Sequence, residues 1–139
     1  MSVMPSLIPG AAVSRTKTFN QETVVAFGAL IDDYAPIHFD ETFAKEGGFS
    51  GCLVHGFLLG SVFSGMLGQQ LPGPLSVINT VTLKMHKPTV VGESLEYQVR
   101  VEQFSEAVGA VVLALSAKNS IGEIMISGKA TCSFPRRVP

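Results

Sequence analysis

The densest polar cluster in this 139-residue chain lies at residues 32–40. Within it, Asp33, Pro36 and His38 fall inside six residues. Proline fixes one backbone angle and stiffens the turn, so the Asp33 carboxylate and the His38 imidazole can converge on one small volume. A carboxylate and an imidazole held together are what proton transfer at a reacting carbon or at a water molecule requires.

A second chemical feature follows at His55 and Gly56, where an apolar segment begins that predicts a helix. The backbone N–H groups in the first turn of a helix are unpaired and lie at the positive end of its dipole. They can therefore bind a carbonyl oxygen that becomes an oxyanion during a reaction. A carboxylate, an imidazole and an oxyanion site suffice for acid–base chemistry next to a carbonyl group.

The same residues also have structural interpretations. Asp32 and Asp33 can terminate a helix and form side-chain-to-backbone turns, and His38 can be an ordinary surface histidine. A third interpretation is a metal site with the ligands Asp33, His38, Asp40 and His55. No His-x-x-x-His or paired-cysteine spacing supports a metal site. From the residue types alone these alternatives stay open.

The pattern of residues predicts the elements that position this cluster. Asn20 is a good helix cap, and the helix it starts ends near Asp33 because Pro36 disfavours helical geometry in the residue before it. A short helical turn is expected at 40–46 and a long apolar helix from His55–Gly56. Period-two alternation predicts strands at 12–19, 77–86, 93–104, 108–117 and 123–133. This order predicts an α+β domain whose curved antiparallel sheet packs on one central helix.

The central helix has an unusual stripe of small residues. These residues recur every fourth position, and they are Gly56, Gly60, Ser64 and Gly68. Glycine inside a helix is destabilising relative to alanine, so something must approach this stripe closely. A sheet wrapped around the helix would do so, and so would a ligand lying along it.

The composition limits the class of protein. Only 15% of residues are charged and 46% are hydrophobic, so a homo-oligomer that hides apolar surface is expected. The formal net charge of −1 argues against binding to a nucleic-acid backbone. The most apolar run, 57–67, is shorter than the roughly 20 residues of a membrane span, so no membrane association is expected.

The chain length of 139 residues predicts a single domain over 1–139, with loose termini at 1–10 and 135–139. Residues 1–10 lack a positive segment leading into an apolar stretch, so a cytoplasmic location is expected. Cys52 and Cys132 are too few and too far apart for a disulfide scaffold or a zinc site, and buried reduced thiols are expected.

Two motifs together resemble the MaoC-like (R)-specific enoyl-CoA hydratase and dehydratase family. The first is Asp33-x-x-Pro36-x-His38 with Asp40 two residues further on. The second is Val54-His55-Gly56 at the start of an apolar helix that contains Ser64-Gly65. The resemblance runs from about residue 16 to 134. It implies the hot-dog fold, a long antiparallel sheet wrapped around a central helix, and assembly as dimers.

The resemblance also implies roles for particular residues. Asp33 and His38 would activate a water molecule that adds to a trans-2-enoyl thioester, giving the (R)-3-hydroxyacyl thioester, or would catalyse the reverse dehydration. The Gly56 N–H would bind the thioester oxygen, and Ser64 would support the Asp33–His38 dyad. Pro36 and His55 would shape the loops. No metal or cofactor is implied, and the substrate would be an acyl-CoA or acyl-carrier-protein thioester.

Two residues depart from the family pattern. Ala35 stands where the family has asparagine before the proline, and Asp32 stands where glycine is usual. Ala35 motivates an alternative, an acyl-thioester-binding hot-dog subunit with little or no catalysis. A thioesterase on the same fold is a second alternative. Thioesterases of this fold do not usually carry the Asp-x-x-Pro-x-His loop, so the hydratase interpretation is favoured.

Overall fold

The computed structural model describes residues 7–135 and contains five strands and three α-helices in that range. The chain order is β1 (Ala12–Thr18), α1 (Gln21–Ile31), the 3₁₀ turn η1 (Pro36–His38), α2 (Glu41–Glu46), α3 (Gly56–Gln69), β2 (Val77–Met85), β3 (Ser94–Ser105), β4 (Ala110–Lys118) and β5 (Ile124–Ser133). The five strands, α1 and α2 begin and end within two residues of the predicted positions, and α3 begins where it was predicted. The helix caps explain part of this agreement, because the Asn20 side chain accepts the Thr23 N–H at 2.8 Å, as expected.

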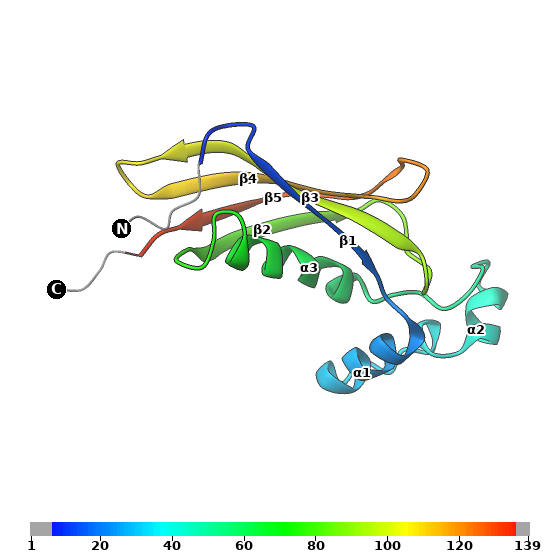
Figure 1. Ribbon diagram of the computed structural model, residues 1–139. Coiled ribbons are helices and arrows are strands. Elements are labelled where there is room, and N and C mark those ends of the chain that lie inside the picture. Colours follow the sequence, from blue (N-terminus) through cyan, green and yellow to red (C-terminus); the bar gives the residue numbers. More distant parts are fainter. Residues whose placement is uncertain (1–6, 136–139) are drawn as a thin grey trace.

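The five strands form one antiparallel sheet in the order β1-β3-β4-β5-β2, and the sheet lies across α3 (Figure 1). Along β4 and residues 94–101 of β3, every second side chain is buried in the core that also contains α3, as period-two alternation requires. These buried side chains are Leu95, Tyr97, Val99, Val101, Val111, Leu113, Leu115 and Ala117. The predicted α+β architecture, with a sheet packed on a central helix, is confirmed.

The face of α3 toward the sheet is fully apolar. Phe63 packs edge-on against Tyr97 with ring centroids 5.1 Å apart, and the Tyr97 hydroxyl donates a hydrogen bond to the Leu59 carbonyl at 2.8 Å. This bond satisfies the one polar group of a ring that is otherwise entirely buried. The start of α3, which carries the predicted oxyanion site, is therefore fixed relative to the middle of the sheet.

Unlike α3, the helix α1 does not pack on the sheet. It extends with α2 from the end of the molecule where α3 begins, away from the sheet (Figure 1). Only Val24 and Gly28 of α1 are buried. Three large side chains of α1 remain exposed, Val25, Leu30 and Ile31. Within a single copy of the chain, the apolar surface of α1 therefore remains uncovered.

Part of the expectation for the termini is wrong. Residues 7–10 are held in place, because Leu7 is buried in the core and the Gly10 N–H donates to the Val101 carbonyl at 2.8 Å. Residues 1–6 and 136–139 lie outside the described part of the chain. Cys52 and Cys132 are buried free thiols, as predicted, and burial raises the pKa of both. Among the helices that the structure describes, none is long and apolar enough to cross a membrane.

Candidate active site

The loop after α1 is folded back tightly against that helix. Asp32 ends the helix with a left-handed backbone conformation (φ 59°), and the Asp33 N–H returns to the Gly28 carbonyl at 2.9 Å. A Cβ atom on Gly28 would lie 2.4 Å from the ring of Phe39 and 2.7 Å from the Asp33 carbonyl oxygen. Only glycine at this position lets the loop pack on α1, so Gly28 helps to set where Asp33 lies.

The two oxygens of the Asp33 carboxylate have different surroundings. Oδ1 accepts the Ala35 N–H at 3.1 Å, which closes a side-chain-to-backbone turn, and the Ala35 carbonyl accepts the His38 N–H at 3.1 Å. Oδ2 faces the His38 ring, with 3.8 Å between Oδ2 and Nε2. Oδ1 thus forms the turn that the structural interpretation predicts, while Oδ2 is left available to a further group. The structure brings Asp33 and His38 together through the 3₁₀ turn that Pro36 starts.

A backbone carbonyl decides which nitrogen of His38 carries a proton. His38 Nδ1 lies 2.8 Å from the Leu53 carbonyl oxygen. A carbonyl only accepts hydrogen bonds, so Nδ1 is the protonated nitrogen and Nε2 is directed at Asp33. Leu53 is itself fixed by an antiparallel bridge to Val90 and by its N–H bond to the Ile37 carbonyl at 3.0 Å. The imidazole is thus oriented by main-chain atoms from two separate segments.

His55 completes the cluster. Its Nε2 lies 3.7 Å from Asp33 Oδ2, and its ring stacks on the His38 ring with centroids 3.8 Å apart and an angle of 23° between the planes. His55 is 2% exposed. Burial lowers its pKa, and the proximity of His38 lowers it further, against a smaller opposing effect of Asp33. We call Asp33, His38 and His55 the site cluster.

These three residues are also the group whose ligand atoms lie close enough to suggest a metal. The stacked arrangement makes them a poor ligand set, because imidazole lone pairs lie in the ring plane and two nearly parallel rings do not aim them at one point. Asp40, the fourth ligand in the metal interpretation, instead caps α2 by accepting the Phe43 N–H at 3.1 Å. The geometry suits hydrogen bonding to a small polar molecule better than it suits a cation.

Gly56 is the first residue of α3, directly after His55, and borders an apolar cavity. The cavity has a volume of about 600 Å³ and lies between α3 and β2. Its walls are formed by Gly56, Phe57, Gly60, Ser61, Val81, Leu83 and Met85. A Cβ atom on Gly60 would lie 2.9 Å from Leu83, so the absence of a side chain there keeps the cavity open. Two of the four small residues in the predicted stripe, Gly56 and Gly60, thus face this space.

Ser64 does not join the cluster within one chain. It lies nine residues after His55, about 13 Å further along the helix axis, and its side chain is exposed. Among the described residues it makes no hydrogen bond to Asp33 or His38. The expected support of the dyad by Ser64 therefore stays a prediction.

Several residues that shape the site were missed by the sequence reasoning. Gly28 carried a signal, since a glycine inside a helix indicates a close approach by another segment. The role of the Leu53 carbonyl had no signal in the sequence, because every residue has the same backbone oxygen. Gln21 also contributes, with its side-chain amide donating to the His38 carbonyl at 2.9 Å. Phe27 and Phe39 contact the edges of the His55 ring, with centroids 5.1 and 5.8 Å from it.

A five-stranded antiparallel sheet laid across one helix, with an acid–base cluster at the start of that helix, defines an enzyme of the hot-dog fold. The MaoC like domain family matches residues 8–126, and this chain belongs to that family. The chain is 35% identical over 130 residues to the (R)-specific enoyl-CoA hydratase of Aeromonas caviae, covering 94% of this chain and 97% of the relative.

Other relatives and solved structures agree. The chain is 30% identical to a mitochondrial 3-hydroxyacyl-[acyl-carrier-protein] dehydratase of Solanum lycopersicum, over 93% of this chain and 78% of that protein. The solved structure of the A. caviae (R)-hydratase superposes with a TM-score of 0.89, covering 94% of this chain and 98% of that one. R-hydratase PhaJ1 of Pseudomonas aeruginosa gives 0.86 at 25% identity, covering 94% and 83%. The predicted family and hot-dog fold are confirmed, and the chain is a hydro-lyase of the hydratase and dehydratase class.

Proposed function

We propose that this enzyme catalyses the (R)-specific hydration of trans-2-enoyl thioesters to (R)-3-hydroxyacyl thioesters, or the reverse dehydration, with Asp33 and His38 acting on the water molecule. The observation that carries the proposal is the 3.8 Å separation of Asp33 Oδ2 and His38 Nε2. A water oxygen can lie at hydrogen-bond distance, about 2.8 Å, from both atoms. The names of the relatives, enoyl-CoA hydratase and hydroxyacyl dehydratase, support the same substrate class.

The reaction requires two proton transfers and no change of oxidation state. Hydration removes a proton from water as its oxygen attacks C3, and it delivers a proton to C2. A dyad that holds one shared proton can do both, since one member accepts the proton of water while the other donates its proton to C2. The dyad then returns to its first state by moving one proton between the two groups. No metal or redox cofactor is needed for these steps.

The start of α3 supplies the electrophilic part of the proposed mechanism. As water attacks C3, negative charge develops on the thioester oxygen, and the Gly56 N–H at the positive end of the α3 dipole would stabilise it. The apolar cavity next to Gly56 suits the acyl chain. Gly60 and Met85 would then contact the chain beyond the reacting carbons. Acyl-CoA and acyl-carrier-protein thioesters share these groups, and both are included in the proposal.

The structure gives little support to a non-catalytic subunit. That alternative rests on Ala35, but the backbone N–H and carbonyl of Ala35 already bond to Asp33 and His38. The loop is thus closed without an asparagine side chain. A cytoplasmic location is also part of our proposal, because the two buried free thiols suit a reducing compartment.

We also propose a homodimer in which the β2 edges of two sheets pair and the two α3 helices lie side by side. The edge strand β2 exposes Val77, Val81 and Met85, and Phe57 of α3 is 86% exposed. A second copy would cover these side chains and the uncovered face of α1. A two-fold axis would make the α3 helices antiparallel and bring Ser64 of the partner subunit toward the site. Sedimentation showing a stable monomer at micromolar concentration would refute the dimer.

The test of the reaction uses the purified protein and a short trans-2-enoyl-CoA. Loss of the conjugated absorbance measures hydration, and an (R)-specific dehydrogenase coupled to the product reports its stereochemistry. A saturated acyl-CoA serves as the control, because a thioesterase would release free thiol from it and a hydratase would not. Formation of the (S)-product, or no loss of absorbance with either an enoyl-CoA or an enoyl-carrier-protein, would contradict the proposal.

A further inference from the structure

His55 is buried at the start of α3, but its ring nitrogens have no structural task. It occupies the cap position of α3 without making a capping hydrogen bond through its side chain. Neither ring nitrogen has a hydrogen-bond partner in the part of the chain that the structure describes. An unpaired buried polar group destabilises a fold, so a carbon ring would suit this position better if packing were its only role.

The surroundings of His55 keep its ring neutral. The titratable groups that face it are Asp33 and His38, and the other contacting rings, Phe27 and Phe39, are uncharged. Burial and the nearby His38 lower the pKa of His55, and these effects exceed the opposing effect of the carboxylate. The ring therefore carries one N–H near neutral pH, and the position of that proton decides what it can do.

The proton belongs on Nε2. This nitrogen is 3.7 Å from Asp33 Oδ2, and a carboxylate is a strong acceptor that favours an N–H directed toward it. The separation is longer than a hydrogen bond, and such distances often shorten when the substrate is bound. Oδ1 of the same carboxylate already accepts the Ala35 N–H at 3.1 Å. With His55 donating to Oδ2, each oxygen of Asp33 has its own donor besides the reacting water.

We propose that His55 is a positioning residue for the dyad, which as a neutral Nε2–H donor directs Asp33 Oδ2 toward the reacting water. This inference rests on the proposed function, because it assigns His55 a part in the same proton transfer. It goes beyond the expectation that His55 only shapes the loop. The stacked ring orients His38, while the N–H acts on Asp33.

Two substitutions distinguish the role of the His55 ring from the role of its N–H donor. His55→Phe keeps an aromatic ring to stack on His38 and removes the N–H, whereas His55→Gln removes the ring and keeps an N–H donor at similar reach. We expect His55→Phe to lower kcat by about tenfold to a hundredfold, the equivalent of one hydrogen bond to a charged group, with little change in KM. We expect His55→Gln to retain most of kcat. His86→Phe is the matched control, because His86 is exposed and bonds only to Ser127 among the described side chains.

The pH profile gives a second readout that packing alone would not change. Loss of the donor removes stabilisation of the ionised carboxylate, so the acid limb of kcat/KM should move to higher pH in His55→Phe and stay in place in His55→Gln. If His55→Phe keeps both kcat and the acid limb, the inference is wrong. A loss of kcat in His55→Gln that equals or exceeds the loss in His55→Phe would also overturn it, because an N–H donor at this position would then not be enough to sustain turnover.

A measurement without substrate separates this inference from the proposed function. The ring ¹⁵N signals of the wild-type protein should show His55 neutral and protonated on Nε2 at pH 7, with its titration displaced to lower pH than that of an ordinary histidine. The Asp33→Asn substitution should shift these signals. A normal titration of His55, or a proton on Nδ1, would refute the inference. An inactive wild type with the expected signals would refute the proposed function alone.

Discussion

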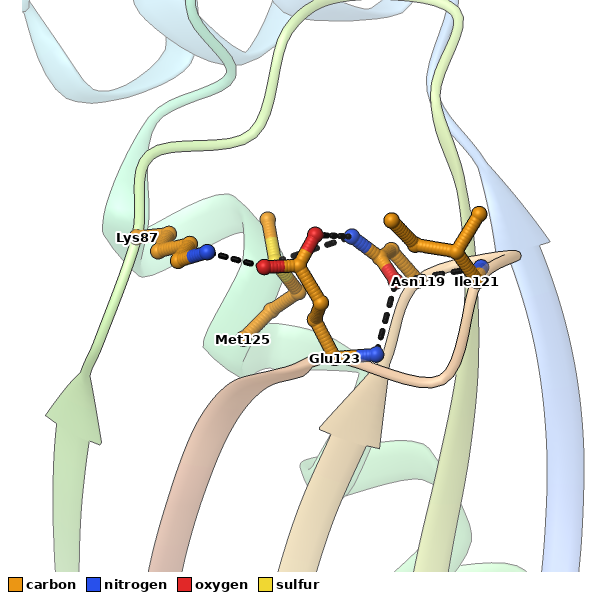
Figure 2. Close-up of polar contacts among 5 residues, drawn as sticks. All are labelled: Lys87, Asn119, Ile121, Glu123 and Met125. Carbon is orange, nitrogen blue, oxygen red and sulfur yellow. Dashed lines mark hydrogen bonds and ion pairs between the residues drawn. The ribbon is translucent and has the colours of Figure 1, made fainter.

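At the turn between β4 and β5, the polar side chains of Asn119, Glu123 and Lys87 bond to one another and to the backbone (Figure 2). The Asn119 side-chain oxygen accepts the N–H groups of Ile121 at 3.2 Å and Glu123 at 2.9 Å, and its amide donates to the Glu123 carboxylate at 3.1 Å. Lys87 pairs with the other carboxylate oxygen. We call Lys87, Asn119 and Glu123 the turn cluster.

The site cluster also combines a carboxylate with nitrogen-bearing side chains, but its polar side-chain atoms are not hydrogen-bonded to one another. Its carboxylate oxygen Oδ2 lies 3.7 and 3.8 Å from two imidazole nitrogens, beyond hydrogen-bond distance, and neither ring nitrogen of His55 has a hydrogen-bond partner among residues 7–135. The hydrogen bonds of the turn cluster are closed within the cluster and its own backbone, which is typical of a structural turn. The site cluster consists of the buried His55 and the half-buried Asp33 and His38, and it is spaced to admit a further group between its members. The open spacing of the polar atoms and the burial of the unpaired His55 ring nitrogens thus distinguish the site cluster from the turn cluster.

The largest effect should follow from removing a member of the dyad. We expect Asp33→Asn and His38→Ala each to lower kcat by about 10²–10⁴, the usual contribution of a positioned acid or base, with the protein still folded. The double variant should be little worse than the worse single variant, because both groups act on one water molecule. Steady-state kinetics on a trans-2-enoyl-CoA measures this. Near-normal turnover in a folded single variant would remove the distinction between the two clusters.

A smaller effect is expected from moving the site cluster without changing its chemistry. Gly28→Ala forces Phe39 and the Asp33 backbone away from α1. We expect kcat to fall by up to about a hundredfold, since displacing a reacting group by about 1 Å can have this effect. Thermal unfolding should also show a loss of about 1–3 kcal/mol from overpacking. Gly68→Ala is the control, because no atom lies within 4 Å of the added Cβ. Equal kinetics for the two variants would show that the loop adapts freely.

Ala35→Asn tests whether the loop lacks anything. The backbone groups of Ala35 are already bonded, so the added amide can contribute at most about one neutral hydrogen bond, and kcat should rise by no more than about fivefold. Kinetics on straight-chain enoyl-CoA substrates checks this. Loss of activity on a larger substrate, with a gain on the short one, would identify Ala35 as a determinant of substrate specificity.

The smallest effect should come from the turn cluster. The hydrogen bonds from Lys87 and Asn119 lower the pKa of Glu123 below its ordinary value of 4.5. Its ionised form therefore stabilises the fold above pH 4.5, and this contribution is lost as the pH falls through the lowered pKa. Glu123→Gln should lower Tm slightly at pH 7, and the difference from wild type should disappear in acid. Its kcat should equal that of wild type, and a large loss of turnover would contradict our assignment of this cluster as structural.

The sequence predicts the parts of this molecule that depend on near neighbours. Asn20 and the period-two strands define element bounds locally, and Pro36 brings Asp33 and His38 together within six residues. The parts that depend on distant packing could not be predicted. The stacking of His55 on His38 joins residues 17 apart through the folded position of α3, and the expected support of the dyad by Ser64 depends on packing that one chain alone does not provide.

The Leu53 carbonyl has a consequence for how this site can change over evolution. The atom that places the proton on His38 belongs to the main chain, so any residue at position 53 supplies it as long as the bridge to Val90 forms. A scan of single substitutions would record position 53 only as a buried apolar site. The information for this contact is stored in backbone geometry and not in the identity of one amino acid, so mutation can alter neighbouring side chains while the histidine keeps its tautomer.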